Sequence, residues 1–395
     1  MSARGLSMPR SFDRPMPDAR RQGRALLLSP GAWNAWWLAG LALLPLQFVQ
    51  LSIVQSGQLW ALALFGMLAW RHLLRGTPRE AYFYLVFMAV ALVETVFSGY
   101  PRIKAAEQII KFGLIYPAFF LVGRAAGEEY LQRKLPYGYI ALWLLLAFEF
   151  AAQRFNLPVI YVAVDFMQGA LHGTFKERNW LAVYFFLASY CLFLQSPRKV
   201  RDATAFVAIN VAVALLSESK TILIPCGMVL MLQFPGRIFL KSIALTAGTF
   251  LFIWRFGYEL SGHLLQVRLE EERGLAFMQS VPLLRENLWG YGFGFVEAHF
   301  SSLWITIKGL GAGTNSVFSS PLDFLIIGGF AGLLFWCVFF LGVGVRSILL
   351  LAPIAAWSLL NPLHQSEIVY LFLGFLVSRG MSGTKREPIA SEVHR

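Results

Sequence analysis

Lys176 and Arg178 stand directly before a long apolar run, in the stretch GTFKERNWLA that extends from Gly173 to Ala182. An arginine presents a planar fork of donors to a phosphate, and a lysine presents a point charge. Arg178 and Asn179 also begin the predicted helix, where free backbone N–H groups favour an anion. The stretch therefore predicts a site for an anionic group. The alternative is that Lys176 and Arg178 only orient the chain or contact anionic lipid headgroups.

The composition of the chain excludes a soluble domain. Of its 395 residues, 57% are hydrophobic, 15% are aromatic and 14% are charged. Apolar runs close to the roughly 20 residues that span a bilayer recur along nearly the whole sequence. We expect an all-α, polytopic integral membrane protein with about twelve transmembrane helices. The predicted spans are 33–54, 58–74, 81–98, 106–124, 137–155, 179–195, 203–218, 221–235, 238–256, 321–345, 347–362 and 366–379.

The tails, the cysteines and the net charge fit this class. Residues 1–31 are rich in Arg, Pro and Ser and predict a disordered tail. Cys191, Cys226 and Cys337 lie inside apolar spans, which indicates neither a disulfide framework nor a metal cluster. The net charge of +12 comes from basic residues scattered over the loops. Topology and anionic lipid explain this pattern better than nucleic acid does.

The Lys and Arg residues of the short loops predict the side of the membrane that each loop faces. With the N-terminus in the cytoplasm, most of them lie inside, and twelve spans return the C-terminus to the cytoplasm. The outer cations gather in two long segments, 154–178 and 255–308. The expected organisation is a tail (1–31), transmembrane helices one to nine (32–256), a large periplasmic loop with helical segments (257–320), helices ten to twelve (321–380) and a cytoplasmic tail (381–395).

Ionisable residues inside the predicted spans fall toward the outer helix ends. Charge within a membrane is costly and is a functional hypothesis by default, although a single residue can snorkel to the interface. A transporter is expected to place such charges at the midplane, beside broken helices. The pattern therefore predicts polar chemistry at the outer face. The residues concerned are Glu94, Glu107, Lys111, Glu149, Glu218, Arg255, Asp323 and Glu367.

Four stretches follow one another in the second half of the chain: GTFKERNWLAVYFF, LLSESKTILI from Leu215 to Ile224, RGLAFMQSVPLLRENLWGYGFGF from Arg273, and TNSVFSSPLDFLIIGGFAGLLF. In order and spacing they resemble segments of the O-antigen ligase and exopolysaccharide polymerase superfamily. The first is similar to the family's segment that opens a helix, and the second to its Ser-(Arg or Lys) segment between two helices. The last two are similar to the large periplasmic loop and its exit.

The resemblance implies transfer of glycans from undecaprenyl pyrophosphate at the periplasmic face of the bacterial inner membrane, with neither a metal nor another cofactor. Because negative charge accumulates on the departing pyrophosphate, cations fixed beside it stabilise the transition state. The implied substrate-binding residues are Lys176, Arg178, Asn179, Lys220, Arg273 and Asn315. The expected partners are the lipid-linked donor, a glycan or lipid-linked acceptor, membrane lipids, and polysaccharide assembly or export proteins.

The acceptor hydroxyl must lose a proton, and the sequence departs from the family at that point. Where the family has His before the Asn, this chain has Thr314, which cannot act as a base near neutral pH. We expect His299 to be the base, with Asp323 and Glu367 next. The remaining candidates are His172, His263, His364 and Glu297.

Several interpretations stay open at this stage. The departure at position 314 favours polymerisation of exopolysaccharide or O-antigen repeat units over the ligase reaction, which transfers glycan to the lipid A core. The chain could also be a carrier that exports lipid-linked glycan, or an assembly partner without catalysis. Within the loop, the run 263–284 predicts an amphipathic helix near the interface. The segment WGYGFGF predicts either a close approach of backbone to a ligand or an aromatic turn.

Overall fold

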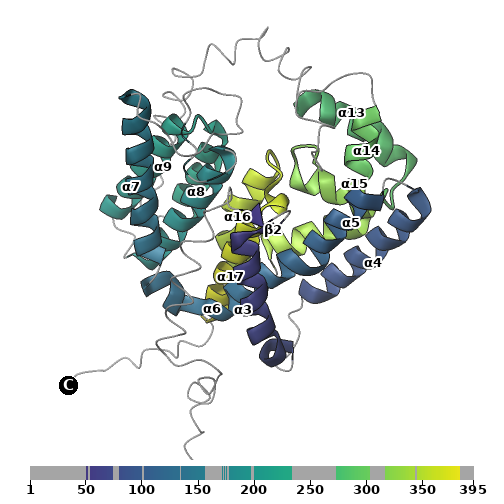
Figure 1. The fold of residues 1–395 in the computed structure, drawn as a ribbon, viewed down its shortest axis with the longest axis horizontal. Helices are drawn as coiled ribbons and strands as arrows, with labels where there is room; N and C mark the ends of the chain where they lie inside the picture. Colours follow the sequence, from purple (N-terminus) through teal and green to yellow (C-terminus); the bar gives the residue numbers. More distant parts are fainter. Residues whose placement is uncertain are drawn as a thin grey trace, which may run out of the picture.

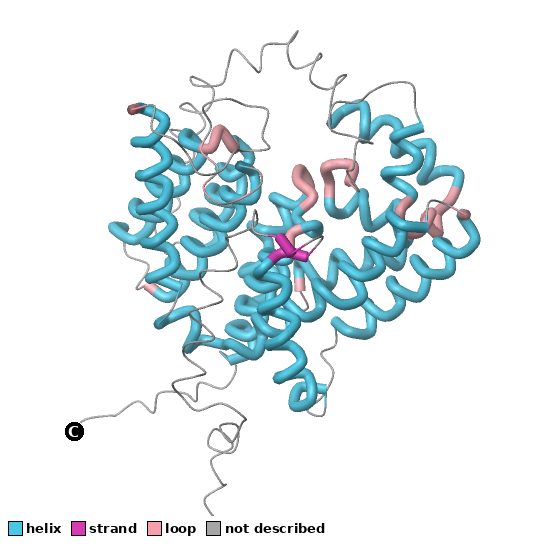
Figure 2. Tube along the Cα trace, viewed as in Figure 1, coloured by secondary structure: helices cyan, strands magenta, loops and turns pink. Residues whose placement is uncertain are grey.

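Helices make up nearly all of the chain that the computed structural model describes (Figure 1, Figure 2). The described residues are 50–51, 54–73, 80–99, 102–133, 135–155, 171, 173, 175, 178–196, 200–233, 273–302, 316–342 and 345–382. Both predicted tails, the predicted span 238–256 and most of the predicted span 33–54 lie outside them.

Apart from the end of the span 33–54, a helix lies at each predicted span within the described residues. The α-helices are α3 (Ser56–Leu73), α4 (Glu80–Ser98), α5 (Arg102–Ile110), α6 (Tyr116–Arg133), α7 (Leu135–Arg154), α8 (Arg178–Gln195), α9 (Val200–Leu216), α10 (Leu223–Gln233), α13 (Arg273–Glu286), α14 (Phe295–Ser302), α15 (Ser320–Trp336), α16 (Val345–Ser358) and α17 (Glu367–Ser382). Shorter helical turns are η1 (Lys111–Ile115), η2 (Lys220–Ile222), η4 (Cys337–Leu341) and η5 (Leu363–Gln365).

The end of the first predicted span is wrong. Instead of continuing a helix to residue 54, the chain forms two short antiparallel strands, β1 (Gln50–Leu51) and β2 (Val54–Gln55). Their pairing uses backbone groups that a helix would need for its own hydrogen bonds. The backbone N–H of Gln55 then donates to Gln58 Oε1 at 3.1 Å, at the start of α3.

Three described helical segments are long and apolar enough to cross a membrane: Glu80–Ser98, Ile103–Arg124 and Ser320–Leu341. Shorter apolar helices are Asn179–Gln195, Lys220–Gln233, Ser347–Ser358 and Glu367–Ser378. On α4, most apolar side chains point away from the protein; Val96 is 79% exposed and Phe97 is 82% exposed. A helix that is apolar all round yet faces outward requires an apolar environment. The fold is therefore that of a helical membrane protein.

The centre of the molecule is the close pair formed by α6 and α17. A Cβ atom on Gly123 would lie 2.1 Å from the carbonyl oxygen of Leu371, and one on Gly374 would lie 2.3 Å from that of Phe120. Glycine at both positions lets the two backbones touch, as small residues do between helices in membranes. Nearby, the rings of Tyr116 and Tyr370 stack at 4.4 Å.

Helix α15 is broken in its middle at Gly328 and Gly329, whose backbone angles are not helical. The break leaves carbonyl groups without helical partners inside a membrane span, where each unpaired group is costly. The segment 287–294 supplies the partners. The backbone N–H of Tyr291 donates to Ile326 O at 2.7 Å, and that of Gly292 donates to Ile327 O at 3.0 Å.

The glycines of WGYGFGF make close contacts, but they approach the protein's own helices. Gly290, Gly292 and Gly294 all have positive φ. A Cβ atom on Gly292 would lie 2.4 Å from the backbone nitrogen of Thr95 in α4, and one on Gly294 would lie 2.9 Å from that of Ala105 in α5. The close backbone approaches that the structure describes here are to the protein's own helices, and the approach to a ligand stays a prediction. These glycines let the segment pack between α4, α5 and α15.

Most of the described loops and turns gather in the upper part of the view in Figure 2. We call this the upper end: it is where α7 and α9 end and where α8, α15 and α17 begin. Figure 1 shows α7, α8 and α9 on one side of the molecule and α13 and α14 on the other, with α16 and α17 between them.

Candidate functional site

The start of α8 and the turn before η2 meet at the upper end. Ser219 Oγ lies 3.1 Å from Asn179 Oδ1, and the hydroxyl donates to the amide oxygen. Asn179 follows Arg178, the first residue of α8, and Ser219 precedes Lys220, the first residue of η2. The structure thus brings together two cation-bearing segments that are 40 residues apart in the sequence.

The turn that carries Ser219 is shaped by its own side chains. The hydroxyl of Ser217 donates to Val213 O at 2.6 Å and accepts from the backbone N–H of Ser219 at 3.4 Å. Between them, Glu218 has a φ of 53°, which is uncommon for a residue with a side chain. This sharp reversal ends α9 and sets Lys220 at the start of the next helical turn.

The segment before α8 is anchored to α7 and α9. The backbone N–H of Leu171 donates to Leu216 O at 2.9 Å, and that of Gly173 donates to Glu149 Oε2 at 2.7 Å. Gly173 has a φ of +58°, a conformation that glycine adopts without strain. Phe175 is buried beside it, with 2% of its surface exposed.

An apolar groove adjoins this anchored segment. It has a volume of about 190 Å³ and is lined by Trp143, Leu146, Ala147, Phe150 and Leu216. Leu216 is the residue whose carbonyl accepts from Leu171. The side chain of Leu146 lies 3.6 Å from the position of a Cβ atom on Gly173. An apolar surface and the cation-bearing segment therefore lie side by side.

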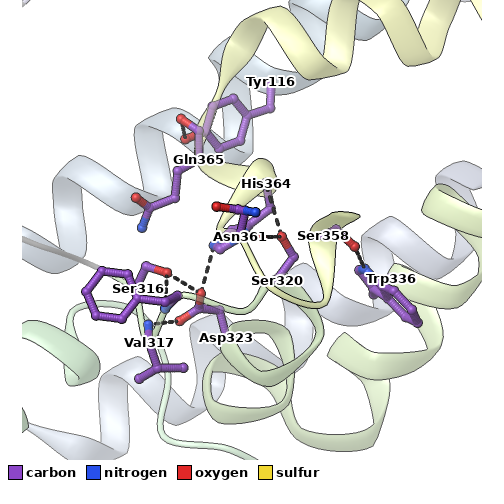
Figure 3. Close-up of polar contacts among 11 residues, drawn as sticks. Tyr116, Ser316, Val317, Ser320, Asp323, Trp336, Ser358, Asn361, His364 and Gln365 are labelled. Carbon is purple, nitrogen blue, oxygen red and sulfur yellow. Dashed lines mark hydrogen bonds and ion pairs between the residues drawn. The ribbon is translucent and has the colours of Figure 1, made fainter. Parts of the chain in front are cut away.

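A second polar cluster joins the start of α15 to η5 (Figure 3). Asp323 is fully buried; its carboxylate accepts from Ser316 Oγ at 2.5 Å and from the backbone N–H of Val317 at 2.8 Å. His364 is also fully buried, and its Nε2 lies 3.7 Å from Asp323 Oδ2. On the other side of the ring, Nδ1 lies 3.2 Å from Ser320 Oγ.

The order Ser320, His364, Asp323 resembles a nucleophilic triad, but the contacts argue against one. Ser320 Oγ donates to Asn361 O at 3.0 Å, so its proton is directed at a carbonyl group and not at the imidazole. All three side chains are fully buried, whereas a nucleophile must be accessible to its substrate. In this arrangement the cluster holds η5 against the start of α15.

Burial changes the ionisation of His364, which lies in η5, outside the apolar helices. Loss of solvent lowers the pKa of His364 from 6.5 to about 3, so the imidazole is neutral near pH 7. The folded protein holds His364 neutral, whereas the unfolded chain takes up a proton below pH 6.5. The contribution of the neutral His364 to the free energy of unfolding is therefore fully present above pH 6.5. It is lost as the pH falls toward 3.

We therefore expect acidification below pH 6.5 to destabilise the protein, and His364→Gln to weaken that dependence. The measurement is the thermal unfolding temperature in detergent from pH 7.5 to pH 5. His299→Gln is the matched control, because the pKa of His299 is also lowered by burial but its ring is only partly buried. A His364→Gln variant with the acid sensitivity of the wild type would contradict this assignment.

Glu367 begins α17 and is 9% exposed. Its Oε1 accepts from Gln58 Nε2 at 3.5 Å, which links the starts of α17 and α3. It lies close in sequence to the Asp323–His364 cluster and retains a small exposed surface. Of the three predicted bases, it is the one that begins a helix.

His299 lies in α14, on the far side of the molecule from α8 (Figure 1). Its ring stacks on Phe295 at a centroid distance of 5.0 Å. Burial lowers its pKa, while the charge of Glu286 acts in the opposite direction. The neighbouring Glu297 pairs with Lys104 of α5 at 3.5 Å, which fixes α14 to that helix.

The structure does not gather all the predicted site residues in one place. Asn179 bonds to Ser219, the residue before Lys220; Asp323 lies near the start of α15, Glu367 begins α17, and His299 lies in α14. Lys176, Thr314 and Asn315 are outside the described residues, and only the backbone is described for Arg178 and Arg273. Among the described residues, no group of three His, Cys, Asp or Glu side chains could hold a metal ion.

Comparison of the chain with known proteins finds no relative. The chain matches no family model, no curated protein and no solved structure.

Two features of the site were not predicted from the sequence. Glu149 was noted as an ionisable residue in a span, but its bond to Gly173 joins positions 24 residues apart and has no local signal. His364 was considered only as a base. The neighbouring Ser320 and Asn361, which now explain its orientation, are common loop residues with no distinctive spacing.

Proposed function

We propose that this chain is a multi-pass glycosyltransferase of the bacterial inner membrane that polymerises glycan repeat units carried on undecaprenyl pyrophosphate, at the periplasmic face. The observation that carries the proposal is the hydrogen bond between Asn179 and Ser219. It joins the segments GTFKERN and SESK, which resemble segments of the O-antigen ligase and exopolysaccharide polymerase superfamily. Arg178 and Lys220 stand next to the two bonded residues, so their backbones are held near each other.

The chemistry calls for paired cations. The bond between C1 of the donor sugar and the pyrophosphate oxygen breaks, C1 bonds to the acceptor hydroxyl oxygen, and the hydroxyl proton passes to a base. Because charge builds on the departing pyrophosphate, Arg178 and Lys220 would stabilise the transition state more than the ground state. The proposal assigns this charge to side chains and not to a metal ion.

The base is assigned to Glu367, which begins α17, because His299 lies in α14, on the far side of the molecule from α8 and Arg178 (Figure 1). Both oxygens of Asp323 accept hydrogen bonds from the 316–317 turn, and the carboxylate is fully buried. A general base must come within hydrogen-bond reach of the proton that it removes. Asp323 therefore fits the role of holding the start of α15 better than that of contacting the acceptor.

The apolar groove beside the Gly173 segment supports a lipid-linked donor. A polyprenyl pyrophosphate needs an apolar surface next to a cationic one, and here Leu146 and Leu216 line the groove while also contacting the anchored segment. A free nucleotide sugar has no lipid chain that could bind to such a surface.

A carrier of lipid-linked glycan is the second candidate, because the span containing α15 is broken at Gly328 and Gly329. Broken helices line substrate sites in transporters. Here the freed carbonyl groups of Ile326 and Ile327 are already bonded to the 287–294 segment, which leaves them no role toward a substrate. The glycosyltransferase is therefore the better-supported proposal, with the ligase reaction as its closest variant.

The test is transfer by the purified protein in proteoliposomes that contain lipid-linked repeat units. We expect glycans of two or more units and released undecaprenyl pyrophosphate. Movement of the donor across the bilayer without a new glycosidic bond would favour the carrier. Transfer that requires added lipid A core would identify the ligase, and a protein that does neither would refute the proposal.

A further inference from the structure

The segment from residue 171 to residue 179 is held at three described points. Leu171 bonds to the end of α9, Gly173 bonds to Glu149 of α7, and Asn179 bonds to Ser219 ahead of η2. Lys176 and Arg178 belong to the stretch between the second and third of these points. Whatever fixes Gly173 therefore fixes one end of the cation-bearing stretch.

The bond that holds Gly173 is accepted by a buried carboxylate, Glu149. Glu149 is 3% exposed, and burial of a carboxylate is costly unless hydrogen bonds compensate. Its bond from the Gly173 N–H is 2.7 Å long, within the range of charge-assisted bonds. An apolar side chain of similar size would pack at this position without that cost, so the carboxylate requires an explanation other than packing.

Gly173 itself has little freedom to move. Its φ of +58° suits glycine, and a Cβ atom there would lie 3.1 Å from Leu181 Cδ1 in α8. The turn therefore lies close to Leu181, in the first part of α8, on one side and is bonded to α7 on the other. A small displacement at Gly173 would be passed on to the start of α8, where Arg178 lies.

We propose that Glu149 is a positioning residue that holds the Gly173 turn and thereby sets the start of α8, which carries Arg178, for an anionic donor. The inference rests on the proposed function. Glu149 touches neither the donor nor the reacting atoms in this proposal. It acts through the Gly173 N–H, so any residue that offers an oxygen in the same place should substitute for it.

The test compares Glu149→Ala with Glu149→Gln, because glutamine keeps an oxygen acceptor and removes the charge. We expect Glu149→Ala to lower the turnover of lipid-linked donor on the order of 100-fold, the cost of a misplaced catalytic group. Glu149→Gln should recover most of it. Hydrogen exchange should show faster exchange of the Gly173 amide in the alanine variant and near wild-type exchange in the glutamine variant. Glu80→Ala, which changes a glutamate in the first turn of α4, is the matched control and should alter neither.

Other results overturn the inference. Wild-type turnover in Glu149→Ala would show that the segment holds its place without Glu149. Equal loss in both variants with unchanged exchange at Gly173 would show that the charge acts directly and not by positioning. If the wild type itself transfers no sugar, the proposed function fails. The exchange contrast between the two variants still decides whether Glu149 holds the turn.

Discussion

Arg178→Ala is expected to lower glycan transfer by about 100- to 1,000-fold, the usual cost of removing one preorganised group that stabilises charge in a transition state. Arg178 is the first residue of α8, and its neighbour Asn179 is bonded to Ser219. The substitution leaves this bond and the apolar face of α8 intact. The variant should therefore reach the membrane in normal amounts, and the loss should be seen in the initial rate of transfer in proteoliposomes.

The conservative variant sharpens this prediction. Arg178→Lys keeps the charge and loses the planar fork of donors, so its rate should fall between those of the alanine variant and the wild type. Lys220→Ala should resemble Arg178→Ala, because Lys220 stands next to Ser219 on the other side of the same contact. Arg201→Ala is the matched control: its side chain is 91% exposed near the start of α9, away from this contact. Near-normal polymer from Arg178→Ala would remove that residue from the site.

Arg273 is tested separately, because α13 lies across the upper end from α8 (Figure 1). The sequence resemblance predicts that Arg273→Ala also abolishes chain growth. Arg285→Ala, which changes an exposed arginine in the last turn of the same helix, is its control. If Arg273→Ala and Arg285→Ala transfer glycan equally well, the donor site consists of the α8 and η2 segments without α13.

The positions of the apolar helices could be predicted because long apolar runs mark helices in a membrane protein. The predicted spans 81–98 and 137–155 correspond to α4 (Glu80–Ser98) and α7 (Leu135–Arg154). The break in α15 could not be predicted in the same way. Gly328 and Gly329 lie in an unbroken apolar run, and glycine is common within transmembrane helices. What opens the helix there is the 287–294 segment, which supplies the replacement hydrogen bonds.

The sequence predicted which residue types form the candidate site, but it did not predict which of these residues contact one another. The cations beside helix starts stand out in the sequence, but which of them meet depends on contacts between distant segments. Asn179 and Ser219 are 40 positions apart and share a hydrogen bond. His299 lies in α14, which packs against α15 and so lies away from that bond. For Asp323 the sequence indicated an ionisable group at an outer helix end. Its role in holding the 316–317 turn follows only from its burial and its two hydrogen bonds.

The second large effect is expected at Gly292, where alanine should destabilise the fold on the order of 3 kcal/mol. Two costs add up. The φ of Gly292 is +80°, which strains any residue with a side chain, and the new Cβ atom would lie 2.4 Å from the backbone nitrogen of Thr95. Relief requires the 287–294 segment to move away from α4, which would also stretch the bond from the Gly292 N–H to Ile327 O. The thermal unfolding temperature of the purified protein in detergent should fall clearly.

Gly66→Ala is the matched control for this prediction. Gly66 lies within α3, and no atom lies within 4 Å of the position of its Cβ atom. Alanine favours a helix over glycine by about 1 kcal/mol, so this variant should be as stable as the wild type or more so. If Gly292→Ala unfolded at the temperature of Gly66→Ala, the 287–294 segment would not be packed against α4. The carbonyl groups at the break in α15 would then lack these partners. They could bond to a substrate, as the carrier proposal requires.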